Sequence, residues 1–501
     1  MIPRLPLCIQ QALYVLPFVV ACSQIPRHHP VAPPAPPPAP LLPAVSSDDW
    51  RTQQPPIGSR GHLQMPAPDT HKLDNGATVY CMVRPSGPVS MSLVVNRGAE
   101  DVVQGKSGEA ALTARLLVES TRHRNAFDLA KAAEMFGSTL SSSAQRDYVA
   151  VSLDTLPSDT ERGIELLAEV VREPSWSTQD FSRVRDQWLD DLQAERQSPT
   201  SLASLVAVRA LFGTHRGAPV NGGITDVKSL TLTDLKSWYK DFVVPTNVAL
   251  IVVGPVDSQN TLVAAKRALG SWRAAPSSHS NVQYTAANQD SHRIILVDRK
   301  GAVQSALFVA QPFPRRLEGG HEARLVLNDV LGGLFTSRIN MNLREQHAYT
   351  YGAHSTIVAN RNFGVFAVQT SVRTDATAPA LTELVSELAA VTSSPVQKPL
   401  TDTELTRARA DLRYRLGAHL EHNRFLVADV ESIFSEGLQT NYLSIAPEAY
   451  ATSTLQDVQA QAHHLTPRLL TIVIVGDRVS VEGPLKQAGF SVIEPESGWT
   501  D

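Results

Sequence analysis

Residues 229–254 read SLTLTDLKSWYKDFVVPTNVALIVVG, and a similar pattern returns at residues 453–476 as STLQDVQAQAHHLTPRLLTIVIVG. Three pairs of positions keep a spacing of 222 or 223 residues: Leu232 and Leu455, Asp234 and Asp457, and Gly254 and Gly476. Each copy predicts a capped helix, a short loop and a buried strand that ends at glycine. A repeat of this length predicts two homologous halves, each a domain.

Mixed helical and strand patterns surround the repeat. Asn75-Gly76 lies between two strand-like runs and predicts a hairpin turn. Alternating or continuous apolar runs predict strands at 91–96, 147–154 and 249–253. Helical periodicity predicts helices at 109–119, 126–136, 160–171 and 178–195. We therefore expect an α+β fold.

Composition excludes several classes of protein. The chain has 501 residues, 43% hydrophobic and 19% charged, with a net charge of −4. This length allows roughly two to four domains, and the apolar content excludes a wholly disordered chain. The slight acidity gives no reason to expect nucleic acid as a partner. Three cysteines are too few for a disulfide scaffold.

The N-terminus predicts export. Residues 1–22 hold one basic residue and then an apolar stretch too short to span a membrane, closing on Ala21-Cys22. This pattern resembles the signal of bacterial lipoproteins, which implies that Cys22 is lipidated after cleavage and that the chain is anchored in the cell envelope. Ser23 after the cysteine implies the outer membrane, facing the periplasm. An ordinary cleavable signal remains the alternative.

Residues 23–70 predict a tether. Nine of the 34 prolines lie within residues 26–43, and such a run favours extended polyproline II over packed structure. We interpret it as a semi-rigid spacer, with a proline-rich partner ligand as the alternative. Cys81 is then the only cysteine of the folded body, and its alternating apolar surroundings predict a buried thiol rather than a nucleophile.

The repeat divides the remaining chain. We expect an N-terminal domain at 71–275, a linker rich in Ser, Asn and Gln at 276–290, and a C-terminal domain at 291–495. Common catalytic motifs, such as a phosphate loop or a nucleophile elbow, are missing from the sequence. His419 and His422 are spaced as metal ligands on one helical face, but their charged flanks favour a solvated surface.

Landmark motifs then point to a family. The N-terminal half has Leu73-Asp-Asn-Gly76, Asn96-Arg-Gly-Ala-Glu100, Ala133-Glu-Met-Phe-Gly137 and Leu166-Leu-Ala-Glu-Val-Val-Arg-Glu-Pro174. The C-terminal half has Leu331-Gly-Gly-Leu-Phe-Thr-Ser-Arg338, Leu343-Arg344-Glu345 and Tyr349-Thr-Tyr351-Gly352. On these motifs the chain resembles the insulinase/pitrilysin-type metallopeptidases, which include mitochondrial processing peptidase subunits. The resemblance implies two homologous halves, each an antiparallel-rich sheet flanked by helices, arranged as half of a clam-shell.

The zinc motif of that family is missing. Active members carry H-x-x-E-H on the helix after Gly108, and there two His hold zinc while Glu activates the bound water. Here Ala111 and Arg115 occupy the ligand positions and Ala114 that of the base. The third ligand, a Glu in the family, aligns with Asp190 or Asp191, and Asp191 is our choice. We therefore expect no metal and no zinc hydrolysis by this chain alone.

The second half of the family's site is present. Active members use an Arg and a Tyr seven residues apart to bind the substrate backbone and the tetrahedral intermediate. Arg344 and Tyr351 have that spacing, which favours Tyr351 over Tyr349, and a guanidinium with a phenol suits a developing oxyanion. A structural interpretation stays open, in which Arg344 pairs with Glu345 and Tyr351 lies in the core.

The functional expectation combines these observations. The resemblance implies a non-catalytic pseudoenzyme that pairs as a heterodimer with a homologous subunit carrying H-x-x-E-H and zinc. Arg344 and Tyr351 would contact a peptide substrate bound by the pair. The alternative is a non-enzymatic scaffold or peptide-binding lipoprotein on the same fold. An independent enzyme with metal at His419 and His422 is a third hypothesis.

Overall fold

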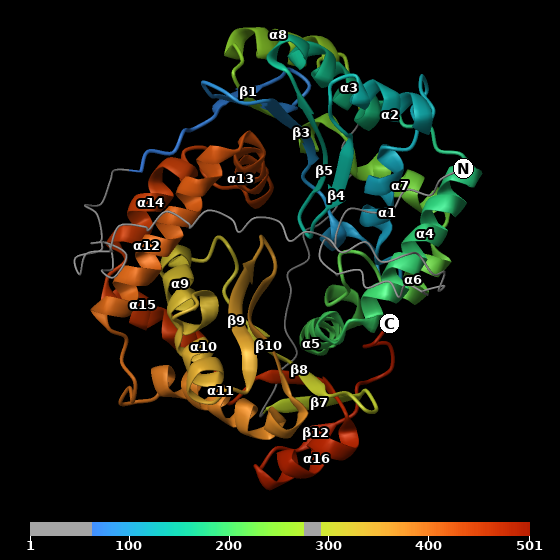
Figure 1. Cartoon of the computed structure of the whole chain (residues 1–501). Coiled ribbons are helices and arrows are strands. Elements are labelled where there is room, and N and C mark those ends of the chain that lie inside the picture. The colour runs from blue at the N-terminus through green and yellow to red at the C-terminus, as the bar shows by residue number, and fades with distance from the viewer. Residues whose placement is uncertain (1–62, 275–291) are drawn as a thin grey trace, which may run out of the picture. The chain divides into compact units, whose positions relative to one another are not determined.

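Two six-stranded sheets, each flanked by helices, form the α+β fold of the computed structural model, which describes residues 63–274 and 292–501 (Figure 1). The first sheet has the strands β1 Asp69–Lys72, β2 Thr78–Val83, β3 Val89–Val95, β4 Ser141–Ala144, β5 Val149–Thr155 and β6 Val248–Gly254. The helices of this half are α1 Glu109–Leu117, α2 Ala126–Glu134, α3 Thr160–Arg172, α4 Thr178–Gln197, α5 Pro199–Arg216, α6 Ile224–Ser229, α7 Leu232–Phe242 and α8 Ser258–Leu269.

The second sheet has the strands β7 Arg293–Asp298, β8 Gln304–Pro312, β9 Thr350–Ala359, β10 Gly364–Arg373, β11 Thr471–Gly476 and β12 Val492–Ile493. Its helices are α9 His321–Asn328, α10 Arg338–Asn340, α11 Thr377–Thr392, α12 Asp402–Ala418, α13 Asn423–Glu436, α14 Tyr442–Thr452, α15 Leu455–Gln461 and α16 Arg478–Gln487. Two segments, η5 Asp329–Gly333 and η6 Met341–Gln346, are π-helical.

Five of the six strands have the same order in both sheets, while the outer strands β1 and β12 differ, since β1 is antiparallel to its neighbour and β12 is parallel. The strand orders are β1-β2-β6-β3-β5-β4 and β12-β7-β11-β8-β10-β9. In each sheet the fully buried strand that ends at glycine, β6 or β11, is parallel to one neighbour and antiparallel to the other. Helices α7 and α15 begin with matching capping boxes, Thr231 with Asp234 and Thr454 with Asp457. The prediction of two homologous halves from residues 229–254 and 453–476 is confirmed.

Each half covers the sheet of the other half with one helix. Helix α13 packs its apolar side on the first sheet, and α5 packs on the second (Figure 1). Three buried pairs on these helices keep the 223-residue spacing: Ala203 and Leu426, Ala207 and Val430, and Ala210 and Ile433. The helices are therefore equivalent elements, and their reciprocal packing builds two hydrophobic clusters that each contain residues of both halves.

The ends of the folded body lie slightly outside the expected range of 71–495. Strand β1 begins at Asp69, and Met65 before it is buried against the first sheet. Trp499 is buried among side chains of α5 and the second sheet. Cys81 is a buried free thiol, as predicted, and burial raises its pKa. Three predicted segments lie outside the described residues: the signal, most of the tether and the linker at 276–290. Among the residues that the structure describes, no helix is long and apolar enough to cross a membrane.

Candidate functional site

Helix α1 begins where the chain has room only for glycine. Gly108 has φ of 91°, and a Cβ there would lie 2.8 Å from Cγ2 of Val227. Two of the predicted site positions on this helix, Ala111 and Ala114, are buried in the core of the first half. They offer methyl groups where the family resemblance predicts a metal ligand and a base.

Arg115 and Asp191 are brought together by the packing of α1 on α4. A guanidinium nitrogen of Arg115 lies 3.3 Å from a carboxylate oxygen of Asp191, and its Cζ lies 4.0 Å from the centre of the Trp188 ring. The Trp188 indole donates a hydrogen bond of 2.9 Å to the carbonyl of Asn221, which holds the ring in place. The structure thus places Asp191 beside Arg115; the assignment of Asp191 to the third ligand position stays a prediction.

The residues at the family's zinc-site positions do not fit a zinc ion; they are Ala111, Ala114, Arg115 and Asp191. Zinc needs three or four neutral imidazole, thiolate or carboxylate donors, and only Asp191 is one. The Arg115 guanidinium has no lone pair to donate, and its charge repels a dication. Within residues 63–274 and 292–501, no group of three or more His, Cys, Asp or Glu side chains is placed to hold a metal.

A buried carboxylate lies six residues before Arg115, at the start of α1. Glu109 begins α1 near Lys106, Asp234 and Asp241, and burial with the nearby Asp234 raises its pKa to about 7, although Lys106 opposes this. Two of these neighbouring charges, Lys106 and Asp234, form their own ion pair of 3.0 Å. This end of α1 is therefore held by charge pairing and contains no imidazole.

In the C-terminal half the chain takes two π-helical turns, a rare conformation that is frequent at functional sites. Segment η5 contains Gly332, where a Cβ would lie 2.6 Å from the backbone nitrogen of Ser355. Burial raises the pKa of Asp329 in this segment to about 6, against the pull of Arg415, whose guanidinium lies 2.5 Å from the carboxylate. These close contacts require the small residue at Gly332 and fix η5 against β9.

Segment η6 carries Arg344. Its Nε lies 3.4 Å from a carboxylate oxygen of Glu345, and its Cζ lies 4.6 Å from the centre of the exposed Phe335 ring. Asn342 anchors the segment by donating hydrogen bonds to Glu383 and Glu387, at 3.0 and 2.8 Å. The pairing with Glu345 agrees with the structural interpretation of Arg344. Both partners are partly exposed, so the guanidinium remains accessible to a ligand.

Tyr351 is not a core residue, because 89% of it is exposed. It lies in a β-bulge of the edge strand β9, where the pairing with β10 shifts between Thr370 and Val372. The Thr370 hydroxyl donates a hydrogen bond of 2.9 Å to the carbonyl of Gly352. The Thr350 hydroxyl accepts one of 3.0 Å from the backbone nitrogen of Gly352. Without the bulge, alternation along β9 would turn Tyr351 to the buried face of Ala353.

The connection between Arg344 and Tyr351 is strained. Ala348 has φ of 51°, the only positive φ of a non-glycine residue in the described part of the chain. Its nitrogen donates 3.1 Å to the carbonyl of Arg344, and its carbonyl accepts 3.0 Å from Arg373. No described hydrogen bond or ring contact joins the side chains of Arg344 and Tyr351 themselves. Their seven-residue spacing therefore positions both groups through the backbone between them.

His419 and His422 do not share a helical face. Helix α12 ends at Ala418, and His422 has extended dihedral angles before α13 begins. His419 lies 2.8 Å from a carboxylate oxygen of Asp429. The break in the helix removes the spacing on which a metal site there depended.

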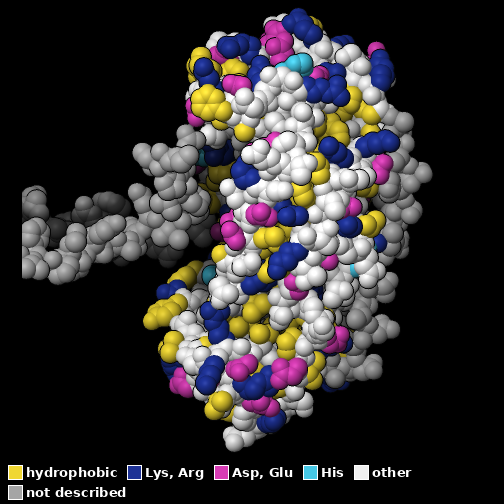
Figure 2. Space-filling view, turned by 90° about the vertical axis from the view of Figure 1, so that its right-hand side faces the viewer, with side chains coloured by type: hydrophobic (Ala, Val, Ile, Leu, Met, Phe, Trp, Pro, Cys, Tyr) yellow, Lys and Arg dark blue, Asp and Glu magenta, His cyan; other side chains and the backbone are white. Residues whose placement is uncertain are grey.

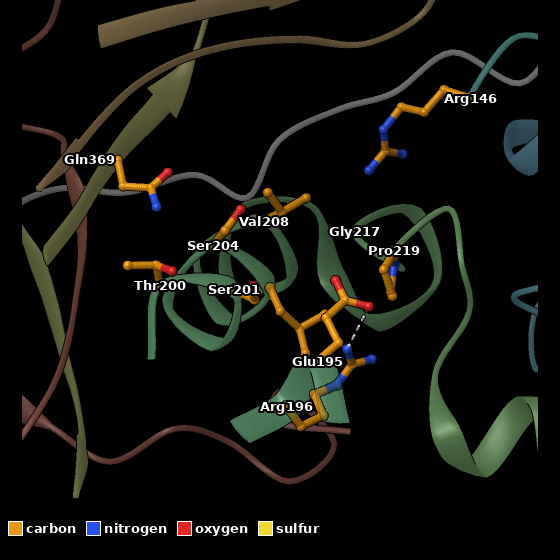
Figure 3. Close-up of a pocket in the computed structure, with 11 residues that line it drawn as sticks. Arg146, Glu195, Arg196, Thr200, Ser201, Ser204, Val208, Gly217, Pro219 and Gln369 are labelled. Carbon is orange, nitrogen blue, oxygen red and sulfur yellow. Dashed lines mark ion pairs between the residues drawn. The ribbon is translucent and has the colours of Figure 1, made fainter. Parts of the chain in front are cut away.

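Sequence analysis missed a polar cavity of about 350 Å³ beside α5. Thr200, Ser201 and Ser204 line it from α5, and Gln369 faces it from β10 (Figure 3). Arg196 lies 3.7 Å from a carboxylate oxygen of Glu195 at its edge. The cavity joins residues of α4, α5 and β10 with Arg146, and nothing in the local sequence signals this.

Charge is evenly distributed on the face that carries α2, α4 and α6. Figure 2 shows Lys and Arg side chains interspersed with Asp and Glu over this face, without a large area of one sign. Such a surface offers no electrostatic footprint for a polyanion.

Family profiles match both halves of the chain. A profile described as insulinase (peptidase family M16) matches residues 83–220, and one described as peptidase M16 inactive domain matches residues 229–412. These ranges contain the α1 and α4 positions and the Arg344–Tyr351 segment, respectively.

Individual relatives cover most of the chain. An uncharacterized zinc protease of Mycobacterium leprae is 24% identical over 78% of this chain and 87% of its own length. The mitochondrial-processing peptidase subunit alpha-2 of Dictyostelium discoideum is 23% identical over 81% of this chain and 91% of its own. A crystal structure of a peptidase M16 inactive domain from Pseudomonas fluorescens has a TM-score of 0.75 at 23% identity, covering 83% of this chain and 98% of that one. This likeness shows a shared fold.

Proposed function

The chain belongs to the peptidase M16 (insulinase) family, as its motifs predicted, and we propose that it is a non-catalytic subunit that completes a zinc peptidase on a partner chain. The partner is a homologue with an intact H-x-x-E-H motif and its zinc ion. This chain supplies Arg344 and Tyr351, which bind the peptide backbone and the oxyanion formed during hydrolysis.

The ion pair between Arg115 and Asp191 carries this proposal. It occupies the family's ligand positions with a guanidinium, which cannot coordinate zinc, and it lies beside the buried methyl groups of Ala111 and Ala114. The other half of the family's site has no such defect. Arg344 and the exposed Tyr351 keep the chemistry that stabilises negative charge in a transition state.

The mechanism assigned to this chain is positional. Arg344 offers a planar cation with several N–H donors, and Tyr351 offers a phenolic O–H from the edge of the second sheet. Strand β9 lies at the edge of the second sheet, the position at which an extended peptide can add as a further strand. The strained turn at Ala348 and the bulge at Tyr351 hold both donors in fixed positions before substrate binds.

We also propose that the chain works at the cell envelope. Cys22 carries a lipid after signal cleavage, and the proline-rich tether holds the folded body away from the outer membrane, in the periplasm. The tether favours extended conformations, so it keeps the substrate-binding surface clear of the lipid headgroups.

Reconstitution tests the proposed function. The purified chain is mixed with a homologous subunit that carries H-x-x-E-H, and peptide hydrolysis is followed with and without a chelator. We expect activity only in the mixture, and Arg344→Ala is expected to lower kcat/KM about 100-fold or more because the oxyanion loses a charged donor. Arg407→Ala, an exposed arginine on α12, is the matched control and should leave activity unchanged.

Two results would overturn the proposal. Chelator-sensitive hydrolysis by this chain without a second subunit contradicts the non-catalytic role. Full activity of the mixture with Arg344→Ala makes Arg344 structural and supports the scaffold or peptide-binding alternative.

A further inference from the structure

A second cavity, of about 400 Å³, lies between α13 and the strands β3, β4 and β5. Five of its lining residues are serine or threonine, and three are charged: Asp154, Arg424 and Glu431. Ser141, on its wall, belongs to β4, which pairs only with β5 and so leaves one strand edge free. The cavity therefore adjoins a place where an extended peptide backbone can bind.

This cavity is the repeat-related equivalent of the one beside α5. Five positions on α5 line that first cavity, and for four of them the position 223 residues later lines the second: Ser201 and Arg424, Ser204 and Val427, Leu205 and Ala428, and Val208 and Glu431. At the position equivalent to Glu431 of α13, helix α5 has Val208. The carboxylate is therefore no requirement of packing this helix on its sheet.

Glu431 is a buried acid without a cation. Only 8% of the residue is exposed, and burial raises its pKa. The side chains of Tyr148 and Ser92 both hydrogen-bond to it, with the Tyr148 hydroxyl at 3.3 Å, but no ion pair to Glu431 exists among the described residues. Burying a carboxylate without a counter-charge costs free energy, which a cation entering the cavity would return.

The other two charges of the cavity balance each other. A guanidinium nitrogen of Arg424 lies 3.4 Å from a carboxylate oxygen of Asp154. The net charge of the lining is therefore −1 when Glu431 is ionised, and the hydroxyl oxygens around it can accept hydrogen bonds. A carboxylate with several hydroxyl acceptors suits a guanidinium or an ammonium group, whose hydrogen atoms are all donors.

We propose that this cavity binds the cationic side chain, arginine or lysine, of an extended peptide, with Glu431 as its counter-charge. The inference rests on the proposed peptide-binding function and adds the class of side chain that the chain selects. It concerns the face of the first sheet covered by α13 and is independent of Arg344 and Tyr351, which lie in the other half.

Matched peptides test the proposal. Isothermal titration of the full chain compares acetyl-Ala-Ala-Arg-Ala-Ala-amide with the same peptide carrying citrulline, which keeps the shape of arginine but has no charge. We expect the arginine peptide to bind about tenfold tighter or better, because its ion pair with Glu431 is mostly shielded from water. Glu431→Gln should reduce the ratio of the two dissociation constants to about one.

Two further variants check that the result depends on the Glu431 carboxylate. Glu431→Val copies the equivalent Val208 and should abolish the preference in the same way. Asp429→Asn is the matched control, since it removes one carboxylate from the same helix but pairs with His419 outside the cavity. It should leave the preference intact, and thermal melting verifies that each variant is folded.

Equal binding of the two peptides by the unmodified chain, including no measurable binding of either, overturns the proposal. A preference that survives in Glu431→Gln and Glu431→Val overturns it as well. Failure here is distinct from failure of the proposed function, because the Arg344→Ala reconstitution measures hydrolysis by the partner and not the choice of side chain.

Discussion

Arg115 and Asp191 form their ion pair near the surface, with 41% and 62% of their side chains exposed. Pairs of this kind contribute about 0–1 kcal/mol to stability, and the stacking of Arg115 on Trp188 adds about 0.5–1 kcal/mol. Arg115 and Asp191 can therefore be exchanged without unfolding α1 or α4. The missing zinc ligands concern a few side chains on α1 and α4, within a fold that the family shares.

A rebuilt motif tests this view of the residues. The variant Ala111→His, Ala114→Glu, Arg115→His and Asp191→Glu restores the family's ligand set on α1 and α4. We expect it to take up one zinc per chain after dialysis, measured by elemental analysis, because the contact of Arg115 with Asp191 shows that the two helices bring these positions together.

Ala111→His alone is the control for that experiment and should take up no stoichiometric zinc, since a single imidazole is too weak a site. Absence of zinc from the folded fourfold variant would contradict the prediction, because it would mean that α1 and α4 no longer hold the family's geometry.

The reciprocal helices dominate at the scale of elements. Helix α13 belongs to the C-terminal half by sequence, yet Leu426, Val430 and Ile433 pack on strands of the first sheet. Helix α5 does the same for the second sheet. A helix of the one half thus stabilises the other, so the stability of each sheet depends on residues from the opposite half of the chain.

Removal of one buried side chain checks this dependence. Leu426→Ala is expected to lower the free energy of unfolding by about 2–5 kcal/mol, because it leaves a cavity under α13. Hydrogen exchange should accelerate in β3 and β6 of the N-terminal half, which α13 covers. Phe425→Ala, at the neighbouring exposed position, should change stability by less than about 1 kcal/mol. Faster exchange confined to the C-terminal half would refute the reciprocal packing.

Polar contacts tie the two halves at the scale of the whole molecule. Asp147 is 1% exposed and accepts a hydrogen bond of 3.1 Å from the backbone nitrogen of Arg361, which lies in the other half. Near the end of the second half, the Asp501 carboxylate accepts 3.0 Å from the backbone nitrogen of Thr225. Together with the reciprocal packing of α5 and α13, these contacts hold the described residues together as one compact unit, and the proposed partner would bind that unit.

The proposed anchor also acts on the whole molecule. Cys22→Ser removes the thiol that would carry lipid, so the chain is expected to move from the membrane fraction to the soluble fraction of the cell envelope. Fractionation followed by immunoblotting measures this, and Cys81→Ser, at the buried thiol, is the matched control that should stay membrane-bound. Equal membrane association of the Cys22→Ser variant would favour an ordinary cleavable signal and another means of attachment.

Much of the fold could be predicted because its signals are local. The Asn75-Gly76 turn, the capping boxes at Thr231 and Thr454 and the apolar strands before Gly254 and Gly476 all follow from residues close together in sequence. The spacing of 222 to 223 residues then predicts the halves. In the candidate site, the sequence alone shows that Ala111 and Arg115 stand where the family has histidines. Residue identity is enough to establish that a zinc-donating side chain is missing.

The tertiary structure decided what depends on distant contacts. Tyr351 is exposed only because hydrogen bonds from Thr350 and Thr370 create a bulge, and strand alternation alone predicts the opposite face. His419 and His422 separate because the helix breaks between them.

By itself, therefore, the sequence determined the duplicated α+β fold, the family and the loss of zinc ligands, since periodicity, capping and residue identity are short-range properties. Only the tertiary structure decided the exchange of α5 and α13, the pairing of Arg115 with Asp191 and the cavity around Glu431. These features join residues far apart in the chain, and such contacts are set by the competition of all side chains for burial rather than by any local pattern.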